Sequence, residues 1–100
     1  MLKHIVLFKL KEKAEGATKE ENAKKLKREL EALSAKIPQI MRMEVGINAV
    51  PSEAAYDVAI YSEFADKDAL AIYQKHPEHM KVVELVKKIV EGRAVTDYIT

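Results

Sequence analysis

The sequence predicts an α+β domain with a ferredoxin-like β-α-β-β-α-β subunit, and three observations support this prediction. Four segments show the period-two alternation of strands, and apolar residues spaced by three and four mark helices between them. The chain has 100 residues, of which 48% are apolar, enough for one core but not for two. For this order of elements, the connection rules favour a four-stranded antiparallel sheet with the helices on one face. We therefore expect one domain covering residues 1–100.

The first predicted strand covers residues 2–10 and has two apolar faces. Ile5 and Leu7 share one face. The other face carries the alternate side chains Leu2, His4, Val6, Phe8 and Leu10. Because both faces are apolar, this strand is expected at the centre of the sheet.

A polar loop over residues 11–17 leads to the first predicted helix, residues 19–36. Thr18 and Glu21 have the spacing of a capping box, in which each side chain bonds the backbone N–H of the other. The approach to Pro38 ends the helix. Its apolar stripe consists of Ala23, Leu26, Leu30, Leu33 and Ile37.

Two strands are predicted in the middle of the chain. Residues 40–49 alternate apolar and polar side chains, which is typical of an edge strand with one wetter face. A turn over residues 50–53 leads to a second strand at residues 56–64, which is apolar on both sides and therefore central.

The last part of the chain predicts two helical segments and a strand. Asp66 caps a short helix, and Pro77 interrupts it and favours the start of another. Gly92 is expected to end that helix, and residues 93–99 form the last strand. The inward side chains of the second helix are expected to be Met80, Val83, Val86, Ile89 and Val90.

Helices on one face of the sheet would leave the other face uncovered. Ile5, Leu7, Ala59 and Tyr61 would then form an apolar patch of the kind that marks an interface. We expect a second copy of the chain to cover this patch, giving a homodimer joined through the sheets.

Charge and composition argue against several other partners and locations. Seventeen basic and sixteen acidic residues give a formal net charge of +1, too balanced to indicate nucleic acid or an anionic membrane. The chain has no cysteine, no apolar run long enough to span a bilayer and no signal-peptide pattern. We therefore expect a soluble cytoplasmic protein.

The three histidines, His4, His76 and His79, are the main candidates for chemistry. No spacing fixes a third metal ligand, so neither a metal nor a cofactor is expected. Histidine titrates near neutral pH and can transfer a proton, and Tyr73 could share a cavity with His79. In the alternative, His76 only caps the helix at Pro77, His4 is a core histidine, and Tyr73 is ordinary packing.

Four segments resemble the stress-responsive A/B barrel domain (Dabb) family. They read LKHIVLFKLK, KIPQIMRMEVGIN, YDVAIYSEFADKDALAIYQKHPEHMKV and AVTDY. The resemblance follows the family's order over nearly the whole chain. Its specific marks are His4, Ile37-Pro38, residues 46–48 and His76-Pro77-x-His79. It implies a dimeric α+β barrel of two ferredoxin-like subunits.

The resemblance also implies that the His4 face is turned toward the helices, around a cavity. Most relatives have no established activity, but the olivetolic acid cyclase branch closes a polyketide by an aldol-type reaction without a cofactor. Its proton-transfer residues correspond here to His4, Tyr73 and His79. Side chains expected to contact a ligand are Val6, Phe8, Val58, Ile60 and His76.

Two functions follow as expectations. In the first, the protein is a small dimeric domain that binds a small apolar ligand between sheet and helices, with no established activity. In the second, it is a cofactor-free proton-transfer enzyme. A barrel monooxygenase shares the expected fold and is a third hypothesis, resting on fold analogy alone.

Overall fold

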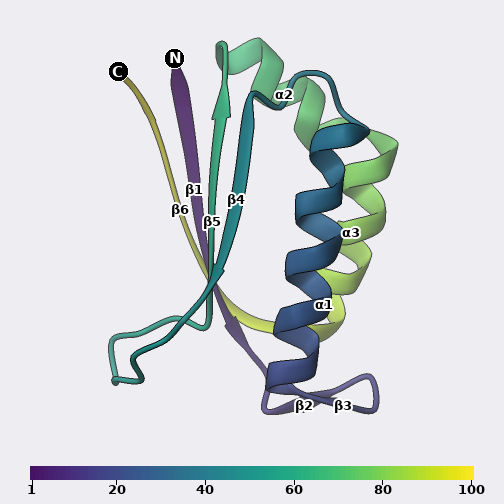
Figure 1. The fold of residues 1–100 in the computed structure, drawn as a ribbon, viewed down its shortest axis with the longest axis vertical. Helices are drawn as coiled ribbons and strands as arrows, with labels where there is room; N and C mark the ends of the chain where they lie inside the picture. Colours follow the sequence, from purple (N-terminus) through teal and green to yellow (C-terminus); the bar gives the residue numbers. More distant parts are fainter.

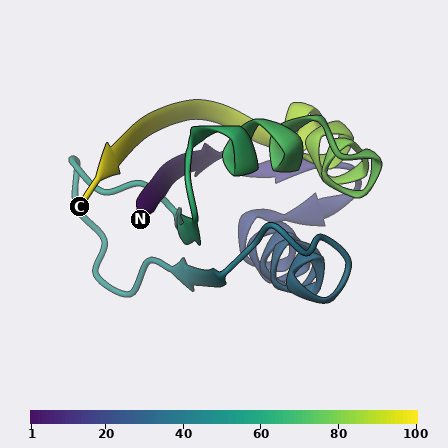
Figure 2. The same ribbon diagram turned by 90° about the horizontal axis from the view of Figure 1, so that it is seen from above.

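Four antiparallel strands form one layer of the fold, and helices form the other. The computed structural model describes all 100 residues and confirms the predicted ferredoxin-like class. The sheet has the order β4-β5-β1-β6, with α1 and α3 side by side along one face (Figures 1 and 2). The main elements are β1 (Leu2–Leu10), α1 (Lys19–Ala32), β4 (Arg42–Ile47), β5 (Val58–Phe64), α2 (Lys67–Lys75), α3 (Pro77–Ile89) and β6 (Val90–Ile99).

The predicted positions of the strands in the sheet are confirmed. β1 is central and pairs with β5 on one side and with β6 on the other, while β4 is an edge strand. In this register His4 lies between Ser62 of β5 and Asp97 of β6. Register therefore brings together residues from opposite ends of the chain.

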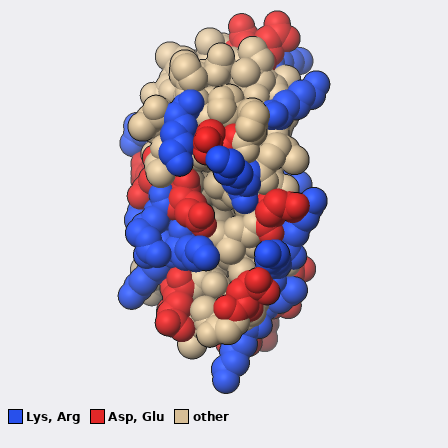
Figure 3. Space-filling model, turned by 90° about the vertical axis from the view of Figure 1, so that its right-hand side faces the viewer, with Lys and Arg blue, Asp and Glu red and all other residues tan.

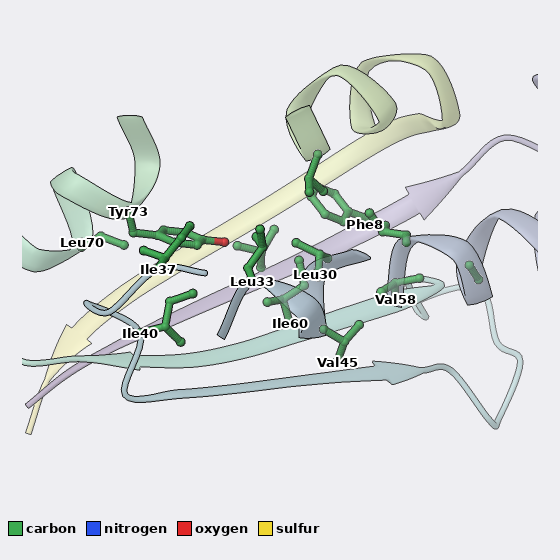
Figure 4. Packing of buried hydrophobic residues seen from close by; sticks show 14 of the residues in the cluster. Phe8, Leu30, Leu33, Ile37, Ile40, Val45, Val58, Ile60, Leu70 and Tyr73 are labelled. Carbon is green, nitrogen blue, oxygen red and sulfur yellow. The ribbon is translucent and has the colours of Figure 1, made fainter. Parts of the chain in front are cut away.

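The core fills the space between the sheet and the helices (Figure 4). Leu26, Ile37 and Phe64 are completely buried there. The alternate residues of β1 from Leu2 to Leu10 are all buried in this layer, which confirms the predicted face of that strand.

Helix α1 starts as the sequence predicts. The Thr18 hydroxyl accepts from the backbone N–H of Glu21 at 3.2 Å, and the Glu21 carboxylate accepts from the N–H of Thr18 at 3.0 Å. The α-helix ends at Ala32, four residues before the predicted end, and a 3-10 turn (η1, Leu33–Ala35) continues it. The tighter turn leads the chain toward Pro38.

The segment predicted as a loop before α1 contains a small hairpin. Its strands are β2 (Lys13–Ala14) and β3 (Ala17–Thr18). Glu15 and Gly16 between them have positive φ values of 53° and 72°, which suit a two-residue turn matching the twist of paired strands. The sequence predicts only a polar loop here, because two paired residues on each side are too few to give a strand pattern.

The two middle strands are shorter than predicted. β4 starts at Arg42 rather than residue 40, and β5 starts at Val58 rather than residue 56. Backbone bonds continue past the regular ladder, since Asn48 N–H donates to the Asp57 carbonyl at 2.9 Å. The connecting segment then leaves the sheet as an exposed loop.

The middle of the predicted inward stripe of α3 is confirmed, since Val83 and Val86 are half-buried and Ile89 is buried, but its first residue is wrong. Met80 is 45% exposed, whereas Val82 is buried. The stripe begins at His79, and Met80 is about 100° further round the helix. Met80 was therefore assigned to the wrong face.

The predicted end of α3 was also wrong. The helix ends at Ile89, and Val90 begins β6 rather than facing inward from the helix. Gly92 lies within β6 opposite Lys9, where an added Cβ would lie 3.3 Å from the Lys9 Cβ. Its lack of a side chain serves close strand pairing, not helix termination.

The face of the sheet opposite the helices has an apolar centre with charged residues beside it. Ile5, Leu7 and Tyr61 are half-buried within the single chain, and Ala59 is exposed. The Tyr61 hydroxyl donates to Glu63 at 2.6 Å. We call this surface the open sheet face.

The outer surface of the helices carries charges of both signs. Figure 3 shows basic and acidic side chains interspersed there, without a large area of one sign. None of the helices combines the length and the apolar character needed to cross a membrane.

Candidate functional site

A cavity of about 290 Å³ lies between the sheet and helices α2 and α3. Apolar side chains make up most of its lining. The lining residues are His4, Val6, Phe8, Leu30, Ile60, Tyr73, Gln74, His79, Val82, Val83, Val86, Lys87 and Arg93. Most are buried or half-buried, but Gln74, Lys87 and Arg93 are exposed and mark its openings.

A larger hollow of about 580 Å³ lies at the other end of the molecule, beside the loop between β4 and β5. It is open, and its lining is mainly charged and polar, without a histidine or tyrosine. Asp57 in its wall is occupied by structural contacts, since it accepts from the Leu10 N–H at 2.8 Å. Size alone therefore does not identify the site, and we take the smaller cavity as the candidate.

The structure brings the three predicted proton-transfer residues together. His4 from β1, Tyr73 from α2 and His79 from α3 all line the cavity. Val6, Phe8 and Ile60 line it too, as expected for residues contacting a ligand.

Two of the residues predicted to contact a ligand lie elsewhere. Val58 is buried in the core opposite Phe8 and Ile47 but does not line the cavity. His76 does not line it either. Its Nδ1 accepts from the N–H of Glu78 at 3.1 Å, which confirms the alternative that His76 caps α3.

The rings of the site form a connected cluster. The ring centroids of Tyr73 and His79 are 4.3 Å apart, and those of Tyr73 and His4 are 6.4 Å apart in an edge-on arrangement. Phe64 supports Tyr73 from the core, with centroids 5.0 Å apart. Tyr73 therefore lies between the two histidines and is in ring contact with both.

His4 is held by an acid that sequence reasoning missed. Its Nδ1 bonds to the carboxylate of Asp97, its neighbour across β1 and β6. A carboxylate accepts, so this bond places a proton on Nδ1 of His4. Nε2 bonds to no protein group, and no buried polar atom lacks a partner, so Nε2 reaches the cavity.

His79 has its proton fixed in the same way, by a backbone carbonyl. Its Nδ1 lies 3.1 Å from the carbonyl oxygen of Gln74, which can only accept, so Nδ1 is the donor. Burial lowers the pKa of His79, with smaller contributions from the nearby His4 and Arg93, although the bond to Gln74 acts in the opposite direction. A neutral His79 with an unprotonated Nε2 is a competent general base.

Tyr73 supplies a hydroxyl that stays protonated. The residue is 2% exposed, and burial raises its pKa to about 12. Figure 4 shows its side chain extending from α2 into the layer between sheet and helices. No hydrogen-bonding group contributes to that shift, so the hydroxyl is free to donate to a molecule in the cavity.

The arrangement is not that of a metal centre. No group of three or more histidine, cysteine or acidic side chains is positioned to hold a metal ion. His4 and His79 each use Nδ1 within the protein, which leaves one nitrogen per ring.

The protonation of His79 gives a testable consequence. We expect its imidazole to titrate below the ordinary value of 6.5, because burial disfavours the cation. The unfolded chain then binds the proton more tightly, so this residue's contribution to stability falls as the pH drops from 6.5 through the folded midpoint. Proton NMR titration of the three histidines, assigned with His79→Gln, measures the midpoints. A His79 midpoint above 6.5 would contradict this account.

The amino-acid sequence is similar to that of a known plant protein. The chain is 32% identical over 101 residues to a stress-response A/B barrel domain-containing protein of Arabidopsis thaliana. The match covers 99% of this chain but 36% of the plant protein. The chain thus spans about a third of the length of that relative.

Solved structures have the same fold. A dimeric protein of unknown function with a ferredoxin-like fold from Bacteroides fragilis is 39% identical, with a TM-score of 0.85, covering 99% of this chain and 95% of that one. The hydroxynitrile lyase of Passiflora edulis has a TM-score of 0.80 over 99% of this chain and 92% of its own, at 17% identity, and shares the fold alone.

The family model for the stress responsive A/B barrel domain matches residues 2–100, nearly the whole chain. With the strand order and the match to the Arabidopsis thaliana protein, this settles the family suggested by the sequence motifs. The chain belongs to the stress-responsive A/B barrel domain (Dabb) family.

Proposed function

We propose that this chain is a homodimeric Dabb domain that binds a small apolar ligand in the cavity between its sheet and helices. The single observation that carries the proposal is the cavity itself, with a mainly apolar wall and a few convergent polar atoms. A volume of about 290 Å³ is at the small end of the range for ligand sites.

The polar atoms lie at one part of the wall. They are Nε2 of His4, Nε2 of His79 and the Tyr73 hydroxyl. The valines of α3 and the apolar residues of β1 line the rest. A compound with one carbonyl or hydroxyl on an apolar body matches this distribution.

Binding of acetophenone and methyl hexyl ketone tests this proposal. We expect both to shift the backbone NMR signals of Val82, Val83 and Val86. Val83→Trp should abolish binding, because a larger side chain fills the cavity. Met80→Trp is the matched control, since Met80 is on the same helix but exposed and outside the lining. Absence of shifts with every ketone, or unchanged binding to Val83→Trp, would reject the proposal.

The second candidate function is cofactor-free proton transfer on a carbonyl compound. It is favoured by the 4.3 Å contact between a neutral histidine and a tyrosine that keeps its proton. In this proposal His79 Nε2 takes a proton from the carbon next to the carbonyl. Tyr73 donates a hydrogen bond to the oxygen that becomes the enolate. His4 orients the substrate from β1.

One solved structure with the same fold is that of an enzyme, which supports the proton-transfer proposal at the level of the fold. The Passiflora edulis protein is a hydroxynitrile lyase, so the fold accommodates an enzyme that acts on a small organic molecule. The identity of 17% carries no residue roles to this chain. The proton-transfer proposal therefore rests on the rings and bonds described above.

Hydrogen–deuterium exchange tests proton transfer without knowledge of the natural substrate. In deuterated buffer, the protein should accelerate exchange of the methyl protons of acetophenone, because His79 removes a proton and returns a deuteron. His79→Gln and Tyr73→Phe should each reduce the rate by about a hundredfold. Tyr56→Phe is the control, since Tyr56 does not line the cavity. If the ketone binds but exchange is no faster than in buffer, binding stands and the enzyme proposal fails.

The homodimer part of the proposal concerns the open sheet face. The Bacteroides fragilis relative is dimeric at 39% identity. In this chain Ile5, Leu7 and Tyr61 form an apolar centre that the helices do not cover. A second copy packed sheet to sheet would remove this apolar surface from water.

Leu7→Lys tests that interface. A lysine there would place an unpaired charge in an apolar contact, at a cost of several kcal/mol, so the variant should sediment as a monomer. Ile72→Lys is the matched control, because Ile72 is 49% exposed on α2, away from the open sheet face. A wild-type dimer that persists in Leu7→Lys would show that another surface makes the interface.

A further inference from the structure

One opening of the cavity carries an unpaired positive charge. Arg93 of β6 is exposed, lines the cavity, and takes part in none of the ion pairs of the protein. Lys87, on the last turns of α3, lines the same cavity. The predicted apolar ligand would give these two cations nothing to bind.

Two acids near this cavity are already committed to other groups. Asp97 bonds to His4, and Glu84 pairs with Lys87 at 3.4 Å. No acidic side chain lines the cavity. The guanidinium of Arg93 is therefore the cation available to an incoming anion.

The register of the sheet places Arg93 and His4 at different points along the cavity wall. Arg93 is paired with Phe8 on β1, whereas His4 is paired with Asp97. The two positions are four residues apart on β1, about 13 Å along an extended strand. Val6 lies between them and also lines the cavity. The cavity thus has a cationic end, an apolar middle and a proton-transferring end.

We propose that the ligand of this cavity is an amphiphilic carboxylate, with its carboxylate bound by Arg93 and its apolar chain in the valine-lined middle of the cavity. This proposal rests on the proposed function, because it assigns a chemical class to the ligand of the same cavity. A guanidinium offers two parallel N–H donors that match the two oxygens of a carboxylate. The apolar chain would replace water against Val6, Val82 and Val86.

This assignment differs from a purely apolar ligand in one respect that can be measured. The free energy of a charge-assisted hydrogen bond depends on the carboxylate and on Arg93, whereas burial of the chain depends on neither. Octanoate and n-octanol share the same chain and differ in the head group. Comparing them isolates the contribution of Arg93.

The experiment is calorimetric titration of the full chain with octanoate and with n-octanol near neutral pH. Octanoate should bind at least tenfold more tightly than n-octanol. Arg93→Gln should weaken the binding of octanoate by about tenfold and leave the affinity for n-octanol unchanged. Arg93→Lys should recover part of the lost octanoate affinity. High salt should weaken the binding of octanoate and leave that of n-octanol unchanged.

Lys88→Gln is the matched control. Like Arg93→Gln it removes one positive charge, here from the last turn of α3, but Lys88 faces Glu15 at 3.8 Å and does not line the cavity. Its affinity for both compounds should equal that of the wild type. Melting curves of the variants confirm that each is folded.

Two outcomes would overturn the proposal and can be told apart. If n-octanol and the ketones bind but Arg93→Gln does not change octanoate affinity, the cavity takes neutral ligands. Arg93 is then a solvated surface residue, and the proposed function stands. If octanoate, n-octanol and the ketones all fail to bind, the proposed function fails as well.

Discussion

The structure depends on the strict alternation of side chains along β1. Because neighbouring side chains point to opposite faces, one row of this central strand builds the core and cavity while the other builds the open sheet face. A register slip of one residue would move His4 from the cavity to the open sheet face. Pairing on both sides, with β5 and with β6, excludes such a slip. The candidate site and the candidate interface are thus fixed by the same hydrogen-bond ladder.

The cavity exists because the side chains of α3 that face the sheet are short. Val82, Val83 and Val86 line it, where leucine or phenylalanine would fill much of the space. On α1 and in the segment that follows it, by contrast, Leu26 and Ile37 are completely buried and Leu33 is 1% exposed. The domain therefore has a closely packed core beside α1 and a cavity beside α3. In a chain whose core is small for its surface, space left open in this way costs stability, and a bound molecule would offset that cost.

Sequence patterns predicted local features well and long-range partners poorly. The capping box of Thr18 and the cap at His76 depend on neighbours two or three residues away, which sequence shows directly. Asp97 was missed because it is 93 residues from His4, and only strand register brings them together. Arg93 was missed for the same reason. Met80 was assigned inward because the apolar spacing on α3 allows two stripes, and only packing selects the one that starts at His79.

The placement of protons in the cavity is the strongest sign that it is a site rather than a packing defect. Asp97 and the Gln74 carbonyl each hold a proton on Nδ1 of a histidine, which leaves Nε2 of both rings free to bond to a molecule in the cavity. Tyr73 adds a donor between them, with burial keeping its proton in place. A polar group buried without a partner costs about 1–3 kcal/mol. The three polar atoms avoid this cost because they reach the cavity, where water or a ligand can bond to them. A bond to Nδ1 would satisfy any buried histidine, but two rings that also turn Nε2 toward one cavity are what a proton-transferring or hydrogen-bonding site requires.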